Sequence, residues 1–297
     1  MFNKASSFNQ DISSWDVSSV TTMYGMFAYA SSFNQPLEDW DVSSVADMVG
    51  MFYEASAFNQ NLSAWCVTNI GSQPSGFSTN SPLIESNMPV WGTCPSITAI
   101  PDPNFEQALI DLGLDSGEID GQVLTANING VTSIVLGGFN ISDLTGIEGF
   151  TALEYLTCYD NQLTSLDLSQ NTALEYLECN NNQITSLDLS ANTALISLIC
   201  NSNELTELIV SSNTALEILA SYENQLTELI VSSNPALEIL TCNSNSLTTL
   251  DLSSNPNLEI LNVGNNQLET LDLRNGNNSI ISYFIATYNP NLSCIFV

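Results

Sequence analysis

The chain has 297 residues, with 32 acidic side chains, two basic side chains, no histidine and a net charge of −30. Only 11% of the residues are charged, against about 25% in an ordinary soluble protein, so the imbalance reflects missing bases rather than surplus acids. This composition excludes a basic nucleic-acid-binding or anionic-membrane-binding surface, a histidine general base and a histidine metal ligand.

The first segment contains three repeats with a period of 25 residues, which open at Met1, Met26 and Met51. The first two, MFNKASSFNQDISSWDVSSVTTMYG and MFAYASSFNQPLEDWDVSSVADMVG, are identical at 16 of 25 positions. Units this short cannot bury an apolar face alone, so they are predicted to stack as coils of a solenoid. We interpret Phe-Asn-Gln and Trp-Asp-Val-Ser as turn and strand pieces of one coil.

The pattern MFxxAxxFNQ followed by WDVSxV resembles the repeats of BspA-like leucine-rich repeat surface proteins, the DUF285 type. The resemblance covers residues 1–97. It implies a stacked array with a role outside the cell.

Two cysteines bracket the end of this array. Cys66 replaces the Asp of the Trp-Asp-Val motif, and Cys94 follows after a stretch rich in Ser, Pro and Gly. A terminal repeat leaves an open edge that must be covered. We therefore interpret the stretch as a C-terminal cap closed by a Cys66–Cys94 disulfide. The alternative is two unrelated buried thiols.

Residues 98–150 are predicted to form a capping helix and the first, irregular leucine-rich units. Asp102 and Pro103 suit the N-cap and first position of a helix, and Phe105, Ala108, Leu109 and Leu112 follow at helical spacing up to Gly113. The acids in LDSGEIDG do not have the spacing of a calcium loop, which favours a solvated turn.

Residues 151–297 contain six strict units of 21 residues, followed by a distorted unit from about Asn277. Each unit carries the spacing L-x-x-L-x-L-x-x-N twice, which predicts a flat coil with a strand on one side and a second extended segment opposite. Asn residues are expected at both corners: 161, 182, 203, 224, 245 and 266 at one, and 171, 192, 213, 234 and 255 at the other.

The predicted fold class is therefore a β-rich solenoid of leucine-rich repeat arrays with short parallel strands and few helices. The second array resembles the leucine-rich repeats of secreted Bacteroidetes surface proteins and, more loosely, those of the internalins, over about residues 98–297.

One inward column of the second array holds thiols, at Cys158, Cys179, Cys200 and Cys242. A ladder of thiolate metal ligands is one interpretation. Cysteines on parallel strands lie along a line rather than at the corners of a tetrahedron, which favours buried free thiols that pack as small hydrophobes.

The outward positions supply the candidate binding residues. The tyrosines are Tyr155, Tyr159, Tyr176 and Tyr222, and they share the first strand's face with Glu154, Glu175, Glu217, Glu238 and Glu259. Exposed aromatic side chains beside polar ones suit recognition of a sugar or a peptide. The alternative is that tyrosine simply favours strands.

The acidic columns raise the question of a metal. The Glu column and a second column, Asp167, Asp188, Asp251 and Asp272, would place like charges on neighbouring coils, about 4.8 Å apart. Weak Ca²⁺ binding between the coils is one interpretation, and a solvated acidic face is the other. No further cofactor is expected.

Catalysis is not expected. Two carboxylates can form a glycosidase site, but the acids of identical repeats do not have the two distinct environments that an acid and a base require.

Taken together, the patterns predict a non-enzymatic, monomeric binding or adhesion module. It would be secreted or at the cell surface, and it would recognise a host or neighbouring-cell protein or a glycan. The alternative is a structural spacer or a calcium-stabilised stalk. Met1 lies in the repeat column of Met26 and Met51, and the chain ends within a half-coil. We therefore expect the signal and anchor segments to lie outside this sequence, with no membrane insertion within it.

Overall fold

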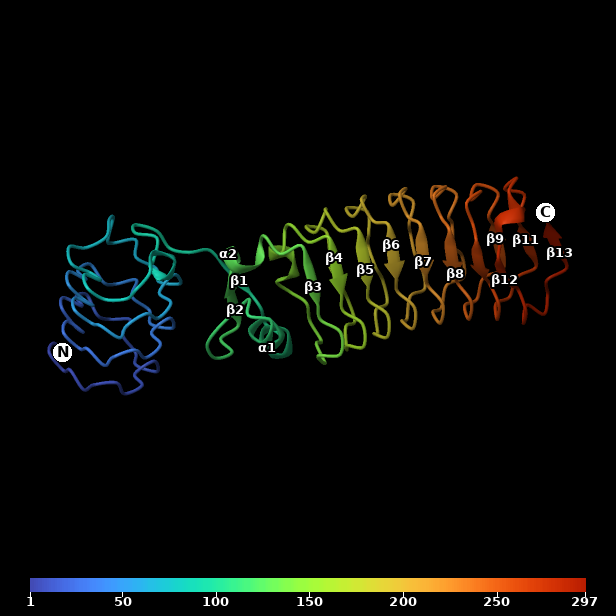
Figure 1. The fold of residues 1–297 in the computed structure, drawn as a ribbon. Coiled ribbons are helices and arrows are strands. Elements are labelled where there is room, and N and C mark those ends of the chain that lie inside the picture. The colour runs from blue at the N-terminus through green and yellow to red at the C-terminus, as the bar shows by residue number, and fades with distance from the viewer. The chain divides into compact units, whose positions relative to one another are not determined.

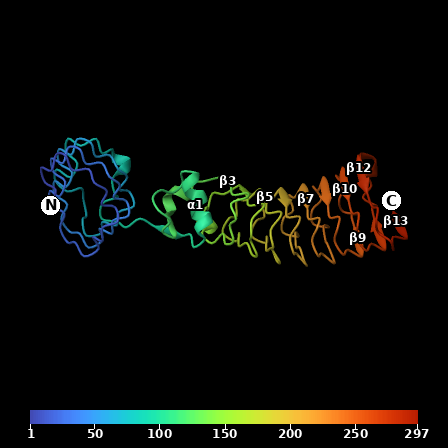
Figure 2. The same cartoon turned by 90° about the horizontal axis from the view of Figure 1, so that it is seen from below.

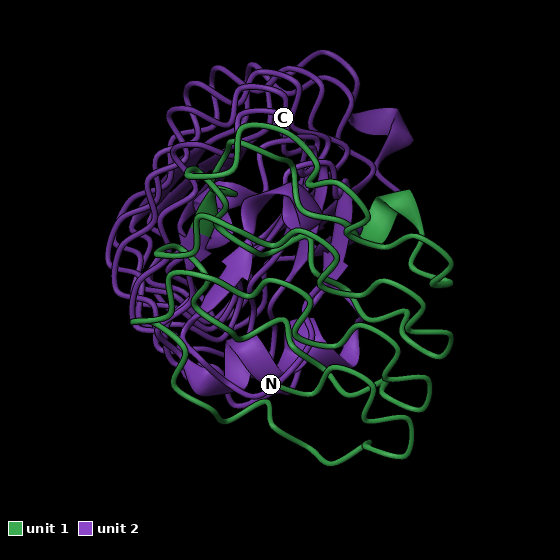
Figure 3. Ribbon diagram, turned by 90° about the vertical axis from the view of Figure 1, so that its left-hand side faces the viewer, with its two compact units in different colours: residues 1–97 green, residues 98–297 purple.

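The computed structural model describes residues 1–297, which fold as two units, Met1–Ile97 and Thr98–Val297 (Figure 3). None of its helices has the length and apolar character that a membrane crossing requires.

The first unit is a stack of coils made of turns (Figure 1). Successive coils are joined by backbone hydrogen bonds, such as those from Phe27 to Met51 at 2.9 Å and from Phe52 to Phe77 at 2.7 Å. Its regular elements are the 3-10 turn η1 (Glu85–Asn87) and an isolated bridge between Thr22 and Asp47.

The prediction of a strand at Trp-Asp-Val-Ser is wrong. The backbone N–H of Ser18 donates to the Asp16 carboxylate at 3.1 Å, and Ser43 donates to Asp41 in the same way. These Asx turns bend the chain in the first two repeats, so the segment forms no continuous ladder.

Aromatic rings fill the first unit's core in two parallel stacks. Phe27 and Phe52 lie 5.6 Å apart between ring centroids, and Phe33 and Phe58 lie 5.8 Å apart. Within one coil the two stacks touch, with Phe27 and Phe33 at 4.2 Å. The 25-residue recurrence of Phe therefore reflects ring-on-ring packing between coils.

The Phe-Asn-Gln motif also bonds coil to coil. The Asn9 amide oxygen accepts the N–H of Asn34 at 2.9 Å, and the Asn34 amide oxygen accepts that of Asn59 at 3.0 Å. The indole N–H of Trp65 donates to the Leu37 carbonyl of the preceding coil at 2.8 Å. Each motif residue thus satisfies backbone groups that a sheet would otherwise pair.

The end of this unit is covered by residues 71–94. Phe77 ends a Phe stack, since it meets Phe52 edge to face at 5.5 Å between ring centroids, and it meets Trp91 edge to face at 4.9 Å. Cys66 and Cys94 form a disulfide across this segment.

The second unit begins with a helical cap. The strands β1 (Ile97–Ala99) and β2 (Gln122–Leu124) form a two-stranded sheet beside α1 (Pro103–Asp111) and the short α2 (Thr125–Ile128). The predicted helix is confirmed, with Pro103 at its first position and Asp102 accepting the N–H groups of Asn104 and Phe105.

Asp102 also ties this helix to the first coil. Its second carboxylate oxygen accepts the N–H and hydroxyl of Ser142 at 2.8 and 2.7 Å and the N–H of Asp143 at 3.0 Å. Burial raises the pKa of Asp102, but the hydrogen bonds, led by those from Ser142, outweigh it and hold the pKa below its usual value.

The rest of the unit is a solenoid of coils with two parallel sheets on opposite sides (Figures 1 and 2). The larger sheet has eight strands: β3 (Ser133–Val135), β4 (Tyr155–Thr157), β5 (Tyr176–Glu178), β6 (Ser197–Ile199), β7 (Ile218–Ala220), β8 (Ile239–Thr241), β10 (Ile260–Asn262) and β12 (Tyr283–Ile285). The smaller sheet contains β9 (Thr249–Asp251), β11 (Thr270–Asp272) and β13 (Cys294–Phe296), and the 3-10 turns η2 (Ile147–Gly149) and η3 (Asn278–Ile280) lie between strands.

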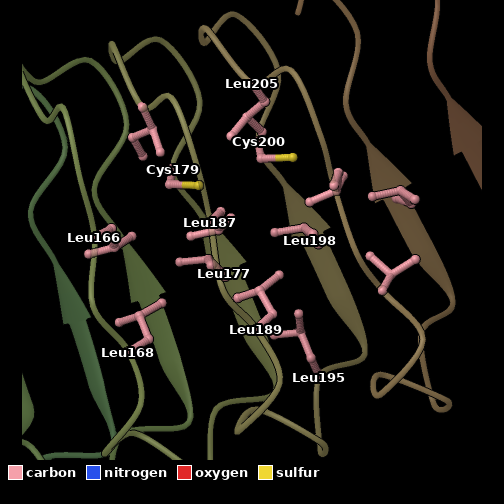
Figure 4. Close-up of a cluster of buried hydrophobic side chains, with 14 of the residues drawn as sticks. Leu166, Leu168, Leu177, Cys179, Leu187, Leu189, Leu195, Leu198, Cys200 and Leu205 are labelled. Carbon is pink, nitrogen blue, oxygen red and sulfur yellow. The ribbon is translucent and has the colours of Figure 1, made fainter. Parts of the chain in front are cut away.

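From β3 to β11, strict register places the central residue of each strand in the core, as in the series Leu156, Leu177 and Leu198. Leucines of the opposite segments meet them, with Cys179 and Cys200 in the same interior (Figure 4). The predicted solenoid of short parallel strands is confirmed.

Asn side chains hold both corners of the coils. At the first corner, the amide of Asn203 donates to the carbonyls of Cys179 and Cys200 at 3.0 and 3.1 Å, and its oxygen accepts the N–H of Ile184 at 3.0 Å. At the second corner, Asn192 donates to the carbonyls of Leu168 and Asn171 of the preceding coil. The predicted role of the Asn columns is confirmed.

Replacing Asn203 with Ala should destabilise the array, because it leaves the buried N–H of Ile184 without a partner, while the carbonyls of Cys179 and Cys200 keep one donor each, from Asn182 and Asn224. One unpaired buried group costs about 1–3 kcal/mol, so the free energy of unfolding measured in urea should fall by roughly that amount. Ala at the exposed Gln183 should change stability by less than about 0.5 kcal/mol. Equal losses in the two variants would contradict this role of the Asn column.

Thiol counting tests the disulfide. Under denaturing, non-reducing conditions the chain should show five free thiols, because Cys66 and Cys94 are paired and five cysteines are free. Prior reduction should raise the count to seven, and seven thiols without reduction would rule out the bond. A reagent added to the native protein should reach Cys294 first, since the other four free thiols are buried.

Candidate functional site

The outer face of the larger sheet presents the first and third residues of each strand. The register aligns the first residues in one row, which we call the outer row: Ser133, Tyr155, Tyr176, Ser197, Ile218, Ile239, Ile260 and Tyr283. Most of its members are large and apolar, yet none is fully buried except Ser197. The tyrosines on β4 and β5 were among the predicted binding residues, whereas the isoleucines, which repeat just as regularly, were not.

Three of the four predicted tyrosines come together. The rings of Tyr155 and Tyr176 lie 5.8 Å apart, and Tyr176 is 38% exposed. The Tyr159 ring packs against Gly137, where an added Cβ would come within 2.5 Å of its Cζ, and it lies near enough to Tyr155 to affect that residue's pKa. We call Tyr155, Tyr159 and Tyr176 the tyrosine cluster.

Tyr222 does not belong to this cluster. It follows β7, three coils along the solenoid from Tyr159, so at about 4.8 Å per coil the two lie roughly 14 Å apart. All four tyrosines were predicted on the same face, and the strand register then shows which of them lie on neighbouring coils.

Glu178 completes the surroundings of the cluster, although it was not among the predicted binding residues. It is the third residue of β5, directly beside Thr157 in the register. Burial raises the pKa of Tyr155 above its usual value, and the negative charge of Glu178 and the neighbouring Tyr159 raise it further. The Tyr155 hydroxyl therefore stays a neutral hydrogen-bond donor over the physiological pH range.

The predicted glutamates border the outer row. Each lies one residue before its strand, and the backbone N–H of Glu175 donates to the Glu154 carbonyl at 2.8 Å, as does that of Glu259 to Glu238. Ile196 interrupts this column, so the structure separates it into Glu154 with Glu175 and Glu217, Glu238 with Glu259. The acids therefore run beside the row of aromatic and aliphatic side chains.

The Asp column on the opposite side has a structural explanation. Asp167, Asp188 and Asp251 each accept the backbone N–H of the Ser two residues later, at 2.9 Å. The backbone N–H and then the hydroxyl of Ser169 lower the pKa of Asp167, and the hydroxyl and then the backbone N–H of Ser190 lower that of Asp188. The chain contains no group of three or more His, Cys, Asp or Glu side chains placed to hold a metal ion.

Asp272 differs from the others in its partner. Arg274 forms an ion pair with it, which lowers the pKa of Asp272 to about 2, and the guanidinium lies over the Phe296 ring.

The Cys column lies in the core and not in a site. Burial raises the pKa of Cys179 and of Cys242 to about 12, and it raises that of Cys158 and Cys200 well above the usual value. Such thiols are protonated and poor ligands or nucleophiles.

Two protein families match parts of this chain. Residues 1–91 match the family described as "Mycoplasma protein of unknown function, DUF285", and residues 151–192 match "Leucine Rich repeats (2 copies)". The chain therefore combines BspA-like DUF285 repeats with leucine-rich repeats, as the motifs predicted, while an origin in Bacteroidetes stays a prediction. A comparison with curated proteins returns no match.

Several solved structures are similar. The functional domain of InlJ from Listeria monocytogenes, described as including a cysteine ladder, is 23% identical over 67% of this chain and 63% of that one, with a TM-score of 0.38. A leucine-rich repeat protein of Leptospira interrogans is 18% identical over 93% and 64%, at 0.45. Internalin C2 from Listeria monocytogenes is 20% identical over 67% and 96%, at 0.41. The chain thus spans under two thirds of the first two.

Glu178→Gln should lower the pKa of Tyr155 toward its usual value, because it removes a negative charge that disfavours the tyrosinate. Titration of the tyrosine ring carbon by NMR, with Tyr155→Phe to assign the signal, measures the change. Glu154→Gln is the matched control and should move the pKa less. An unchanged pKa in Glu178→Gln would contradict the proximity of the two side chains.

Proposed function

We propose that this chain is a non-enzymatic binding module that recognises a protein ligand through the outer face of its larger sheet. The observation that carries the proposal is the tyrosine cluster, partly exposed on neighbouring strands and bordered by Glu154, Glu175 and Glu178. Leucine-rich repeat folds are typically protein-interaction modules, which agrees with this role.

The chemistry of the cluster suits recognition. A tyrosine offers a large apolar ring with few rotatable bonds and a hydroxyl that can pair with a partner, so it loses little entropy on binding. Tyrosine is also enriched among the residues that dominate interface energies.

The scaffold under the cluster is rigid. Backbone hydrogen bonds join β4 to both β3 and β5, and the Leu156 and Leu177 side chains beneath are buried. A preordered surface avoids part of the cost of ordering on binding. The glutamates alongside add a negative potential that would favour a positively charged partner and speed the encounter.

The same repetition argues against catalysis. Glu154, Glu175, Glu217, Glu238 and Glu259 occupy equivalent positions before their strands. An acid and base pair needs two different environments. We place the module at the cell surface or outside the cell, where the Cys66–Cys94 disulfide would persist. Binding of a glycan is the second form that this surface would support, since aromatic rings also pack on sugars.

The test compares the intact chain with the double variant Tyr155→Ala/Tyr176→Ala on arrays of surface proteins and of glycans. Saturable binding to a protein should weaken at least about tenfold in the variant, the loss expected when central aromatic residues are truncated. Tyr222→Ala, three coils away, is the matched control and should bind within about twofold of the unchanged chain.

The other possible outcomes would each change the proposed function. Saturable binding to glycans alone would replace the protein ligand with a sugar, and turnover of any glycan would overturn the non-enzymatic role. An equal loss of binding in Tyr222→Ala would show that the tyrosine cluster contributes no more to binding than a tyrosine outside it. An absence of saturable binding would favour a structural spacer.

A further inference from the structure

Two neighbouring coils depart from the repeat on the side opposite the outer face. Where the first two units read Ser-Leu-Asp-Leu-Ser, from Ser165 and from Ser186, the next two read Glu-Leu-Ile-Val-Ser, from Glu207 and from Glu228. Both outward residues change together: Ser becomes Glu, and Asp becomes Ile. Of the inward residues, the first stays Leu, and the second changes from Leu to the equally buried Val210 and Val231.

The two isoleucines lie exposed in the middle of the array. Ile209 is 60% exposed and Ile230 is 58% exposed, although a parallel bridge pairs them directly. The adjacent inward residues Leu208 and Leu229 are buried. These isoleucines therefore add little buried apolar area to the core. Their two coils also lack the Asx turns that Asp167 and Asp188 form in the first two units.

Carboxylates surround this apolar pair. Glu207 and Glu228 lie two residues before the isoleucines and so point to the same side, while Asp188 and Asp251 occupy the equivalent position on the coils before and after. A groove of about 360 Å³ opens beside them, with Asp188, Glu207 and Ile209 in its lining. Arg274 is the only base of the second unit, and it pairs with Asp272.

We propose that this surface, which we call the isoleucine patch (Ile209 and Ile230 with Glu207, Glu228, Asp188 and Asp251), docks a basic protein segment. The segment would carry Arg or Lys beside aliphatic side chains. The aliphatic stem of such a residue packs on the isoleucines while its cationic head reaches the carboxylates around them. Charge complementarity selects this partner, since the second unit has no free cation of its own.

The isoleucine patch is separate from the tyrosine cluster. Its isoleucines occupy the same column as Asp251 of β9 and Asp272 of β11, on the segments opposite the larger sheet. The two surfaces can therefore be tested independently, and failure of one leaves the other standing.

The repeat itself supplies the sharpest variant. Ile209→Asp/Ile230→Asp restores the residue of the neighbouring units, and Ser211 and Ser232 stand two residues later, where Ser169 and Ser190 donate to Asp in those units. This variant should fold at least as well, and it adds two negative charges while it removes the apolar pair.

The probe is the peptide acetyl-Arg-Val-Arg-Val-Arg-amide, with a fluorescent label, titrated against the intact chain near physiological salt. It should bind saturably, and Ile209→Asp/Ile230→Asp should weaken binding at least about fivefold despite the added charge. Equal or tighter binding by this variant would show attraction to bulk negative charge alone and would overturn the proposal, as would no binding to the unchanged chain.

A second pair of variants separates the local carboxylates from the total charge. Glu207→Ser/Glu228→Ser should weaken the peptide at least about fivefold, whereas Glu217→Gln/Glu238→Gln, with the same loss of charge on the outer face, should stay within about twofold. The peptide with Gln in place of Arg should not bind detectably. Equal weakening by the two variants would overturn the proposal.

Discussion

The Asn side chains at the coil corners are the interaction on which the second unit depends. A flat coil turns the backbone sharply twice in 21 residues, and each turn leaves N–H and C=O groups that no strand can pair. One Asn side chain, such as Asn203, satisfies groups on its own coil and on the coil before it. Because every coil needs the next one to complete this pairing, the corners tie the stability of each unit to that of its neighbours.

The first unit meets the same constraint in another way. Its Asn9, Asn34 and Asn59 also bond from coil to coil, but the core is a pair of phenylalanine stacks and the chain between them runs through Asx turns. Stacking of each ring on the equivalent ring of the next coil sets the distance between coils, as hydrogen bonding between strands does in the second unit. Both units therefore obtain cohesion from identical residues placed next to each other.

Periodicity explains why the fold was predictable and the site was only partly so. The repeats at 25 and 21 residues determine which residues become neighbours, so the coils, the Asn corners and the inward leucines followed directly. The strand expected at Trp-Asp-Val-Ser failed because Asp16 closes a turn onto Ser18, a local choice that period alone does not reveal. On the surface, Tyr222 and Tyr159 occupy equivalent positions, and only the number of coils between them separates the former from the cluster. Glu178 escaped notice because it departs from the repeat rather than following it.

Near-identity between the units has a consequence for how the chain finds its stacking order. Moving one coil along by a whole unit would match leucine with leucine and Asn with Asn, so many misaligned arrangements have almost the native set of contacts. The native order needs a fixed starting point, and the Asp102 carboxylate provides one, since it binds both the start of α1 and the first coil at Ser142 and Asp143. The helical cap thus fixes the position of the first coil and, through it, the order in which the other coils stack.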